Sequence, residues 1–190
     1  MLISRFDLAA IMPLAGARID EFVLPLHGAM DEYDITTPER AAAFIAQIAH
    51  ESGQLRYVAE IWGPTRLQAG YDQRADLGNT RDEAVRIATA HGSTPGRWWK
   101  GHGLIQVTGY DNHLSCGKAL GLDLLNNPKQ LEEPYAATRS AAWFWNSRKL
   151  NGLADQGEFR AITKKINGGL NGIQDREAYY NRAKKALGVE

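Results

Sequence analysis

The sequence has a single cysteine, Cys116, among 190 residues, so no internal disulfide can form, and synthesis in a reducing compartment fits. Its formal net charge is zero, so the overall charge does not point to nucleic acid. No apolar run is long enough to cross a membrane. What is present, 44% hydrophobic and 23% charged residues, is typical of a soluble globular protein forming one domain or two tight lobes.

The first residues loosely imitate a signal peptide, but two features argue against one. Asp7 and Pro13 interrupt the apolar stretch, and Ser4-x-x-Asp7 is the pattern of an ordinary helix start. We therefore expect no cleaved leader. Towards the other end, the stretch from Lys164 to Lys185 is locally basic, which is typical of a solvated helix face.

Helical patterns dominate the chain, because apolar residues recur at helical spacing between turn residues. We expect helices ending at Pro13, around Ile19 to Leu26, from Thr37 to Glu51, from a Thr80-x-x-Glu83 capping box to Gly92, and over residues 111–120, 134–150, 158–166 and 174–187. The segments between them are predicted to be loops, or a small irregular sheet over residues 53–79, with a β-prone stretch at 104–108. The fold class is therefore mainly α, as a single domain over residues 1–190 with a cleft between helical lobes.

Glu51 stands where one of these helices is predicted to end. Thr37-Pro38 is a typical helix start, and Glu51 follows Phe44 by seven residues and Ile48 by three, at the edge of the apolar face. Partial desolvation there favours the protonated carboxyl, which suits a general acid. Ser52-Gly53 then ends the helix. Most glutamates in a last helical turn are plain surface residues, so this position alone does not establish catalysis.

A glycosidic bond is cut by two carboxyl groups, so Glu51 needs a partner. Glu60 is the nearest candidate downstream, although a continuous helix would hold the two residues about 13 Å apart. The break after Glu51 lets the chain turn back and place Glu60 across a cleft, at the roughly 6.5–9.5 Å that leaves room for a water. Asp72 and Asp76 compete for the same role.

The segment Gly101–Thr108 is a second candidate for chemistry. Glycines on both sides of His102 let the backbone approach a ligand. In an extended strand, Gln106 and Thr108 would point the same way and could hold a sugar or an attacking water. A polar face on a short edge strand explains the pattern equally well.

Turns and tryptophans complete the candidates. The turn Asn167-Gly168-Gly169, with Asn171-Gly172 and Arg176 after it, is either an efficient turn or part of a site. Three adjacent aromatics on one helix, Trp143-Phe144-Trp145, are expected in the core. The tryptophans expected in loops, which are better placed for sugar stacking, are Trp62, Trp98 and Trp99.

Together these residues carry a resemblance. The ordered motifs are Ala49-His50-Glu51-Ser52-Gly53, then Gly-x-Gly-Leu-Ile-Gln-Val-Thr over residues 101–108, then Ala-Ala-Trp-Phe-Trp over 141–145, and Ile-Asn-Gly-Gly-x-Asn-Gly over 166–172. This order resembles glycoside hydrolase family 19, and more narrowly its compact phage endolysins, whose opening Leu-Ala-Ala-Ile-Met-Pro is also similar. The resemblance runs from about residue 36 to 187. It implies a lysozyme-like, two-lobed helical fold with a central substrate cleft and an inverting mechanism.

The resemblance also implies roles. Glu51 matches the general acid, Glu60 the general base and Thr108 the hydroxyl that holds the catalytic water. Gln106, Asn112 and Asn167 match sugar-binding positions, and Arg176 matches a basic residue near the site. Further candidates for substrate binding are His50, Trp62 and His102. We expect no metal and no cofactor.

Two departures from the family pattern bear on the substrate. His102 stands where the family usually has arginine, and it would make part of the site titrate near neutral pH. Asn112-His113 replaces a common Asn-Tyr pair. Plant chitinases of the family often carry disulfides, which one cysteine cannot form. The balance therefore favours the phage or bacterial branch, which acts on peptidoglycan.

The sequence is thus interpreted as an endolysin that hydrolyses the β-1,4 bond between amino sugars of the bacterial wall. Its partner would be the peptidoglycan strand, with no nucleic acid, no membrane insertion and a monomeric state. We expect it to be made in the host cytoplasm and to reach the wall after holin-type permeabilisation.

Four alternatives stay open. A chitinase would share the fold and mechanism. A lytic transglycosylase also has a glutamate followed by serine and a downstream Gly-Leu-Ile-Gln, and releases an anhydro-sugar. A zinc amidase could use His102, His113 and Cys116, although their spacing is a weak ligand pattern. A non-catalytic wall-binding module would give Glu51 no role.

Overall fold

The computed structural model describes residues 3–189, and these form helices and turns with no regular strand. The mainly α prediction is confirmed. The α-helices are α1 (Arg5–Ile11), α2 (Arg18–Glu32), α3 (Pro38–Glu51), α4 (Arg66–Ala69), α5 (Asp82–Ala90), α6 (Pro95–Trp98), α7 (Tyr110–Leu120), α8 (Pro134–Ser147), α9 (Leu150–Asp155), α10 (Phe159–Asn167) and α11 (Ile173–Leu187). Short 3₁₀ turns are η1 (Tyr71–Gln73), η2 (Ala75–Leu77) and η3 (Pro128–Glu132). None of the helices over residues 3–189 has the length and apolarity that a membrane span needs.

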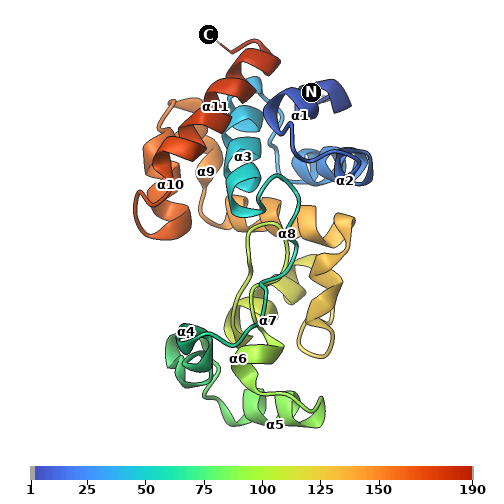
Figure 1. Cartoon of the computed structure of the whole chain (residues 1–190), viewed down its shortest axis with the longest axis vertical. Helices are drawn as coiled ribbons and strands as arrows, with labels where there is room; N and C mark the ends of the chain where they lie inside the picture. The colour runs from blue at the N-terminus through green and yellow to red at the C-terminus, as the bar shows by residue number, and fades with distance from the viewer. Residues whose placement is uncertain (1–2, 190) are drawn as a thin grey trace.

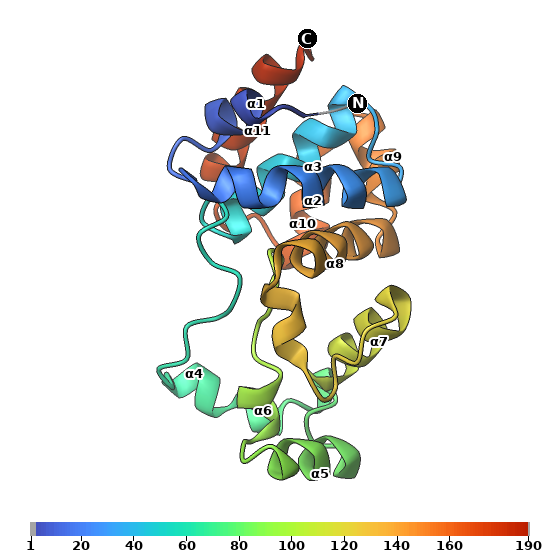
Figure 2. The same cartoon turned by 90° about the vertical axis from the view of Figure 1, so that its right-hand side faces the viewer.

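The helices form two lobes stacked along the long axis (Figures 1 and 2). One lobe holds α1, α2, α3 and α8–α11, and the other holds α4, α5 and α6. Helix α7 lies beneath α8 and contacts it.

Helix α3 is the centre of the larger lobe. Thr37 caps its start by accepting a hydrogen bond from Arg40 N at 3.3 Å, and Pro38 follows at the first helical position. Every residue from Ala41 to Ala49 is buried, because α11 and α9 pack on α3 and its apolar side chains lie in the main hydrophobic core. The Phe44 ring meets Trp145 edge to face at 5.4 Å. The core position expected for Trp145 is confirmed.

A short waist joins the lobes. The chain leaves α3 through residues 52–65 and returns through 99–108, and the two segments lie side by side (Figure 1). Glu60 N donates to Gly101 O at 2.8 Å, and Gly103 N donates to Val58 O at 2.8 Å. His102 and Val107 form a second antiparallel bridge, in which each backbone N–H donates to the other residue's carbonyl oxygen. These isolated bridges are the irregular β region, and they fix Glu60 against the Gly101 loop.

The smaller lobe has its own core. Ala84, Ile87 and Ala88 of α5 pack on Trp99 and Tyr110. Trp99 is fully buried, and its ring meets Tyr110 edge to face at 5.0 Å. Trp99 is therefore a packing residue, and its predicted role as a sugar platform is wrong.

Several predicted boundaries are corrected by the structure. The Thr80-x-x-Glu83 capping box does not form, because α5 begins at Asp82 and the Glu83 carboxylate instead accepts a hydrogen bond from Tyr110 OH at 2.7 Å. The predicted helix 134–150 is broken at Lys149, whose φ is 55°, and α9 continues in a new direction. Helices α4 and α6 lie within segments that were expected to be loops or irregular sheet.

Candidate active site

Glu51 is the last residue of α3, and the chain turns sharply after it. Ser52 is buried, and its Oγ donates to Ile48 O at 2.6 Å and accepts from Leu55 N at 2.8 Å. Gly53, Gln54 and Leu55 all have positive φ, a conformation that costs non-glycine residues on the order of 1–3 kcal/mol each. This turn leaves the Glu51 side chain 20% exposed at the rim of the larger lobe.

Arg176 of α11 holds the Glu51 carboxylate. Its Nη2 donates to Glu51 Oε1 at 2.6 Å, and the guanidinium is 2% exposed. The same guanidinium donates to the side chain of Gln47 and to Asn171 O, and Gln47 in turn donates to Thr163 Oγ1 at 2.8 Å. Among residues 3–189, no hydrogen-bond donor reaches Glu51 Oε2. One carboxylate oxygen is therefore fixed, and the other has no hydrogen-bond partner among these residues.

His50 lies beside Glu51 but binds within the protein. Its Nδ1 is 2.6 Å from Asp175 Oδ2 on α11. Gly172 has a φ of 70° and lies so close to the His50 ring that a Cβ atom would overlap it. The predicted substrate-binding residue His50 thus contributes to docking α11 on α3.

Glu60 lies on the waist, beside the smaller lobe, and is held by three donors. Gln68 Nε2 and Tyr71 OH donate to Oε1 at 2.9 and 3.3 Å, and Gly101 N donates to Oε2 at 3.0 Å. Lys100 Nζ also donates to the Glu60 backbone carbonyl at 2.7 Å. An ionised carboxylate accepts all of these bonds, so the arrangement suits a base.

The two competing aspartates have other partners. Asp72 accepts from Gly96 N at 2.7 Å and anchors the start of α6. Asp76 forms a bidentate pair with Arg74, and its side chain is 62% exposed. Both carboxylates therefore serve local structure, whereas Glu60 lies on the waist between the lobes.

The Gly101–Thr108 segment is a turn, and its predicted extended strand is wrong. Gln106 has a φ of 56°, so Gln106 and Thr108 do not share a strand face. Gln106 Nε2 donates to Gly103 O at 3.0 Å, and Thr108 Oγ1 donates to Gln106 O at 2.8 Å. Gly101 lies against the Gln106 amide, so its missing side chain serves packing of the chain on itself. Asn112 is exposed, and its Nδ2 donates to Thr108 O at 2.7 Å.

His102 is buried rather than facing solvent. It is 1% exposed, and burial, aided by the neighbouring His113, lowers the pKa of His102 to about 3. The expectation that it titrates near neutral pH is wrong. Burial also lowers the pKa of His113 to about 4. His113 Nδ1 lies 2.8 Å from Gly109 O and so donates to it, which leaves Nε2 to accept from His102 Nδ1 at 3.2 Å.

This neutral pair predicts acid sensitivity. Between pH 6.5 and about 4 the unfolded chain binds protons on His102 and His113 that the folded chain does not, so stability falls as pH falls. We expect the free energy of unfolding to drop by about 2 kcal/mol per histidine from pH 7 to pH 5. Urea unfolding at both values measures this drop.

A matched pair of variants isolates the buried histidines. His113→Gln is expected to reduce the pH dependence, whereas His91→Gln, at an exposed position, leaves it unchanged. Equal stability of the wild-type chain at pH 7 and pH 5 would contradict the neutral-pair assignment.

The remaining candidates divide between turn and pocket. Asn167 uses both side-chain groups within its turn, accepting from Gly169 N at 2.9 Å and donating to Asn171 O at 3.0 Å. Trp62 is partly buried and meets Tyr71 edge to face at 6.0 Å. Trp62 and Trp98 both line a pocket, described next.

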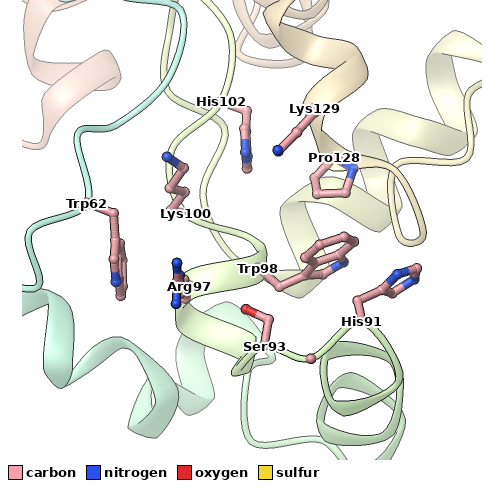
Figure 3. A pocket seen from close by; sticks show the side chains of 10 residues that line it. Trp62, His91, Ser93, Arg97, Trp98, Lys100, His102, Pro128 and Lys129 are labelled. Atoms are coloured by element: carbon pink, nitrogen blue, oxygen red, sulfur yellow. The ribbon is translucent and has the colours of Figure 1, made fainter.

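A pocket of about 300 Å³ is lined by residues of the smaller lobe, the waist and η3 (Figure 3). Its lining consists of Trp62, His91, Gly92, Ser93, Arg97, Trp98, Lys100, His102, Pro128 and Lys129. Figure 3 shows Lys129 reaching into the space from one wall, with Lys100 on the opposite side and Arg97 between the two tryptophans. Within the described part of the chain, no carboxylate lines this pocket.

Sequence reasoning missed the groups that fix the two carboxylates. Gln47 lies one helical turn before Glu51, so helical spacing could have indicated it. Gln68 ends a Thr65-x-x-Gln68 capping box, and that pattern is visible in the sequence. Tyr71, which also binds Glu60, and Asp175, which binds His50, give no local signal.

Comparison with known proteins decides the family. The family model described as Chitinase class I matches residues 23–154. The chain belongs to glycoside hydrolase family 19. An endochitinase of Arabidopsis thaliana is 36% identical over 167 residues, covering 84% of this chain and 52% of that protein. A family 19 domain-containing protein of Haemophilus influenzae is 31% identical over 156 residues, covering 73% of this chain and 76% of that one.

Solved family 19 structures share the fold. A bacterial family 19 chitinase superposes with a TM-score of 0.77 at 25% identity, covering 100% of this chain and 97% of its own. Chitinase C of Streptomyces griseus HUT6037 superposes with a TM-score of 0.76 at 24% identity, covering 98% of this chain and 77% of its own. The chain spans about half the length of the curated plant relatives it matches. It has the lysozyme-like helical fold of glycoside hydrolase family 19.

Proposed function

We propose that this family 19 enzyme hydrolyses the β-1,4 bond between amino sugars of peptidoglycan, acting as an endolysin. The observation that carries the proposal is the pair of anchored carboxylates, with Glu51 held by Arg176 in one lobe and Glu60 held by Gln68 and Tyr71 at the waist. Two carboxyl groups on opposite sides of a bond are what glycoside hydrolysis requires.

In this mechanism Glu51 is the acid. Arg176 fixes Oε1, so the proton is carried by Oε2 and passes to the bridging oxygen as the bond from the anomeric carbon breaks. A water attacks that carbon from the opposite face and gives its proton to Glu60. Thr108 Oγ1, whose hydrogen is donated to Gln106 O, keeps lone pairs that can accept a hydrogen from this water. The configuration at the anomeric carbon is inverted.

Two observations favour peptidoglycan over chitin. The single cysteine excludes the disulfides that plant chitinases of the family often carry. The pocket near Glu60 is lined by cations and, among residues 3–189, by no carboxylate, and chitin, being neutral, offers such cations no anionic partner. An endolysin of this kind would act on the wall after the membrane has been permeabilised, as a monomer on single glycan strands.

A chitinase of the same mechanism is the second candidate, because the plant relatives are named endochitinases and the solved relatives chitinases. A zinc amidase is not supported, since residues 3–189 contain no group of three side chains that could hold a metal. Cys116 is buried, and His102 and His113 bind each other.

The products of purified peptidoglycan and of colloidal chitin test the proposal. We expect new reducing ends from peptidoglycan, first released as the inverted α-anomer by proton NMR. Mass spectrometry separates hydrolysis from transglycosylation by the mass of one water, and free stem peptides would indicate an amidase. Soluble sugars from chitin with none from peptidoglycan would decide for the chitinase, and anhydro products would overturn hydrolysis.

A further inference from the structure

The pocket beside Glu60 concentrates positive charge. Arg97, Lys100 and Lys129 all line it, and none of them has a carboxylate within 4.0 Å in the part of the chain that the structure describes. Glu132 lies at its margin, where its Oε1 is 3.6 Å from the neutral His102 ring. Unopposed cations in a concave site raise the local concentration of anions.

Aromatic faces form the rest of the pocket. The Trp98 indole stacks on His91 at 4.3 Å and donates to Leu125 O at 2.9 Å, so its position is fixed. Trp62 stands on the opposite side (Figure 3). Aromatic rings with a few placed polar groups are the usual lining of a small-ligand site. The ligand that suits both parts is a sugar with a negatively charged substituent.

Two lining residues, Lys100 and Trp62, connect the pocket to the candidate base Glu60. Lys100 donates to the Glu60 carbonyl, and Trp62 contacts Tyr71, which itself donates to the Glu60 carboxylate. A glycan strand lying across Glu60 therefore brings the substituents of a neighbouring sugar to this pocket.

We propose that this pocket binds a carboxylate carried by the glycan and so selects a peptidoglycan strand over a neutral chitin chain. Arg97 and Lys129 are the ligating groups, with Lys100 as a third cation. The inference rests on the proposed function. Peptidoglycan carries such carboxylates in two places, on the stem peptides and, once a peptide is removed, on the lactyl ether of the sugar.

Binding to a Glu51→Gln chain separates recognition from cleavage. Three soluble tetrasaccharides are titrated while the tryptophan indole signals are followed by NMR: one with stem peptides, one stripped of them by an amidase, and neutral chitotetraose. We expect Arg97→Gln/Lys129→Gln to weaken the carboxylate ligands about tenfold or more, and chitotetraose far less. An effect on the stripped ligand alone assigns the lactyl carboxylate, and an effect on the peptide-bearing ligand alone assigns the peptide carboxylates. An effect on both shows that the pocket accepts either carboxylate.

A control removes the same charge elsewhere. Arg86→Gln/Lys118→Gln changes exposed cations outside the pocket and is expected to leave all three affinities unchanged. Lys100 is left intact because it also holds the Glu60 backbone. If the pocket variant weakens all three ligands equally, or none, the inference is overturned.

Failure of the inference and failure of the proposed function look different. Peptidoglycan hydrolysis by the wild-type chain with no change in the pocket variant would remove the pocket's role and leave the function standing. Pocket-dependent binding of the anionic ligands by a chain that cleaves no peptidoglycan would overturn the function and keep the binding site.

Discussion

Replacing Glu51 with glutamine is expected to lower kcat on the glycan by about 10²–10⁴-fold, the usual contribution of a general acid. Glutamine keeps the size of the side chain and can still accept a hydrogen bond from Arg176, but it has no proton to give to the leaving oxygen. The substitution also leaves the buried guanidinium without its counter-charge, which costs about 1–3 kcal/mol of stability. Rates are therefore measured well below the unfolding midpoint, with the fold checked by circular dichroism.

Glu39→Gln is the matched control for Glu51→Gln. It removes a carboxylate from the first turn of the same helix, at the end away from the site, and is expected to retain full activity. Comparable rates for Glu51→Gln and Glu39→Gln, in chains that are both folded, would exclude Glu51 as the acid.

Replacing Glu60 has the second largest expected effect. Glu60→Gln should also lower kcat by about 10²–10⁴-fold, because an amide cannot take the proton of the attacking water. Gly101 N–H donates to one carboxylate oxygen and Gln68 and Tyr71 donate to the other, so the NH₂ group of glutamine must face a donor in either orientation. The variant is therefore expected to be less stable as well, by about 1–3 kcal/mol.

A small nucleophile distinguishes a base from a structural residue. Azide ion attacks without a base, so sodium azide should restore turnover to Glu60→Ala and yield a glycosyl azide. It should not restore Glu51→Ala on a substrate with a poor leaving group, because azide cannot protonate the leaving oxygen. Asp76→Asn, an exposed carboxylate of the smaller lobe, serves as control and should behave as wild type. Full activity of Glu60→Gln would refute the two-carboxylate scheme.

The helices were predictable because their signals are local. Ser4 with Asp7 and Thr37 with Pro38 form the caps that the sequence indicates. Apolar spacing before Glu51 describes a helix face that is indeed buried, and Glu51 itself lies at its edge. These features depend on residues within a few positions of one another, so a sequence pattern contains them.

The site geometry was not predictable in the same way. The expected strand at Gln106 is wrong because Gln106 has a positive φ, and the turn it forms is packed closely against Gly101. His102 was expected to titrate because the unperturbed pKa of histidine lies near neutral pH, yet contacts from other segments bury it. Such outcomes depend on residues brought together only by the complete fold.

The ion pair between Arg176 and Glu51 joins residues 125 positions apart, and Arg176 lies on α11, the last helix in the described part of the chain. During synthesis Glu51 leaves the ribosome long before its guanidinium partner does. A nascent chain that ends before α11 has an uncovered α3 face and a carboxylate that nothing orients. The order of translation therefore delays assembly of the proposed proton donor until α11 has been made, so chains that end before α11 are expected to be inert.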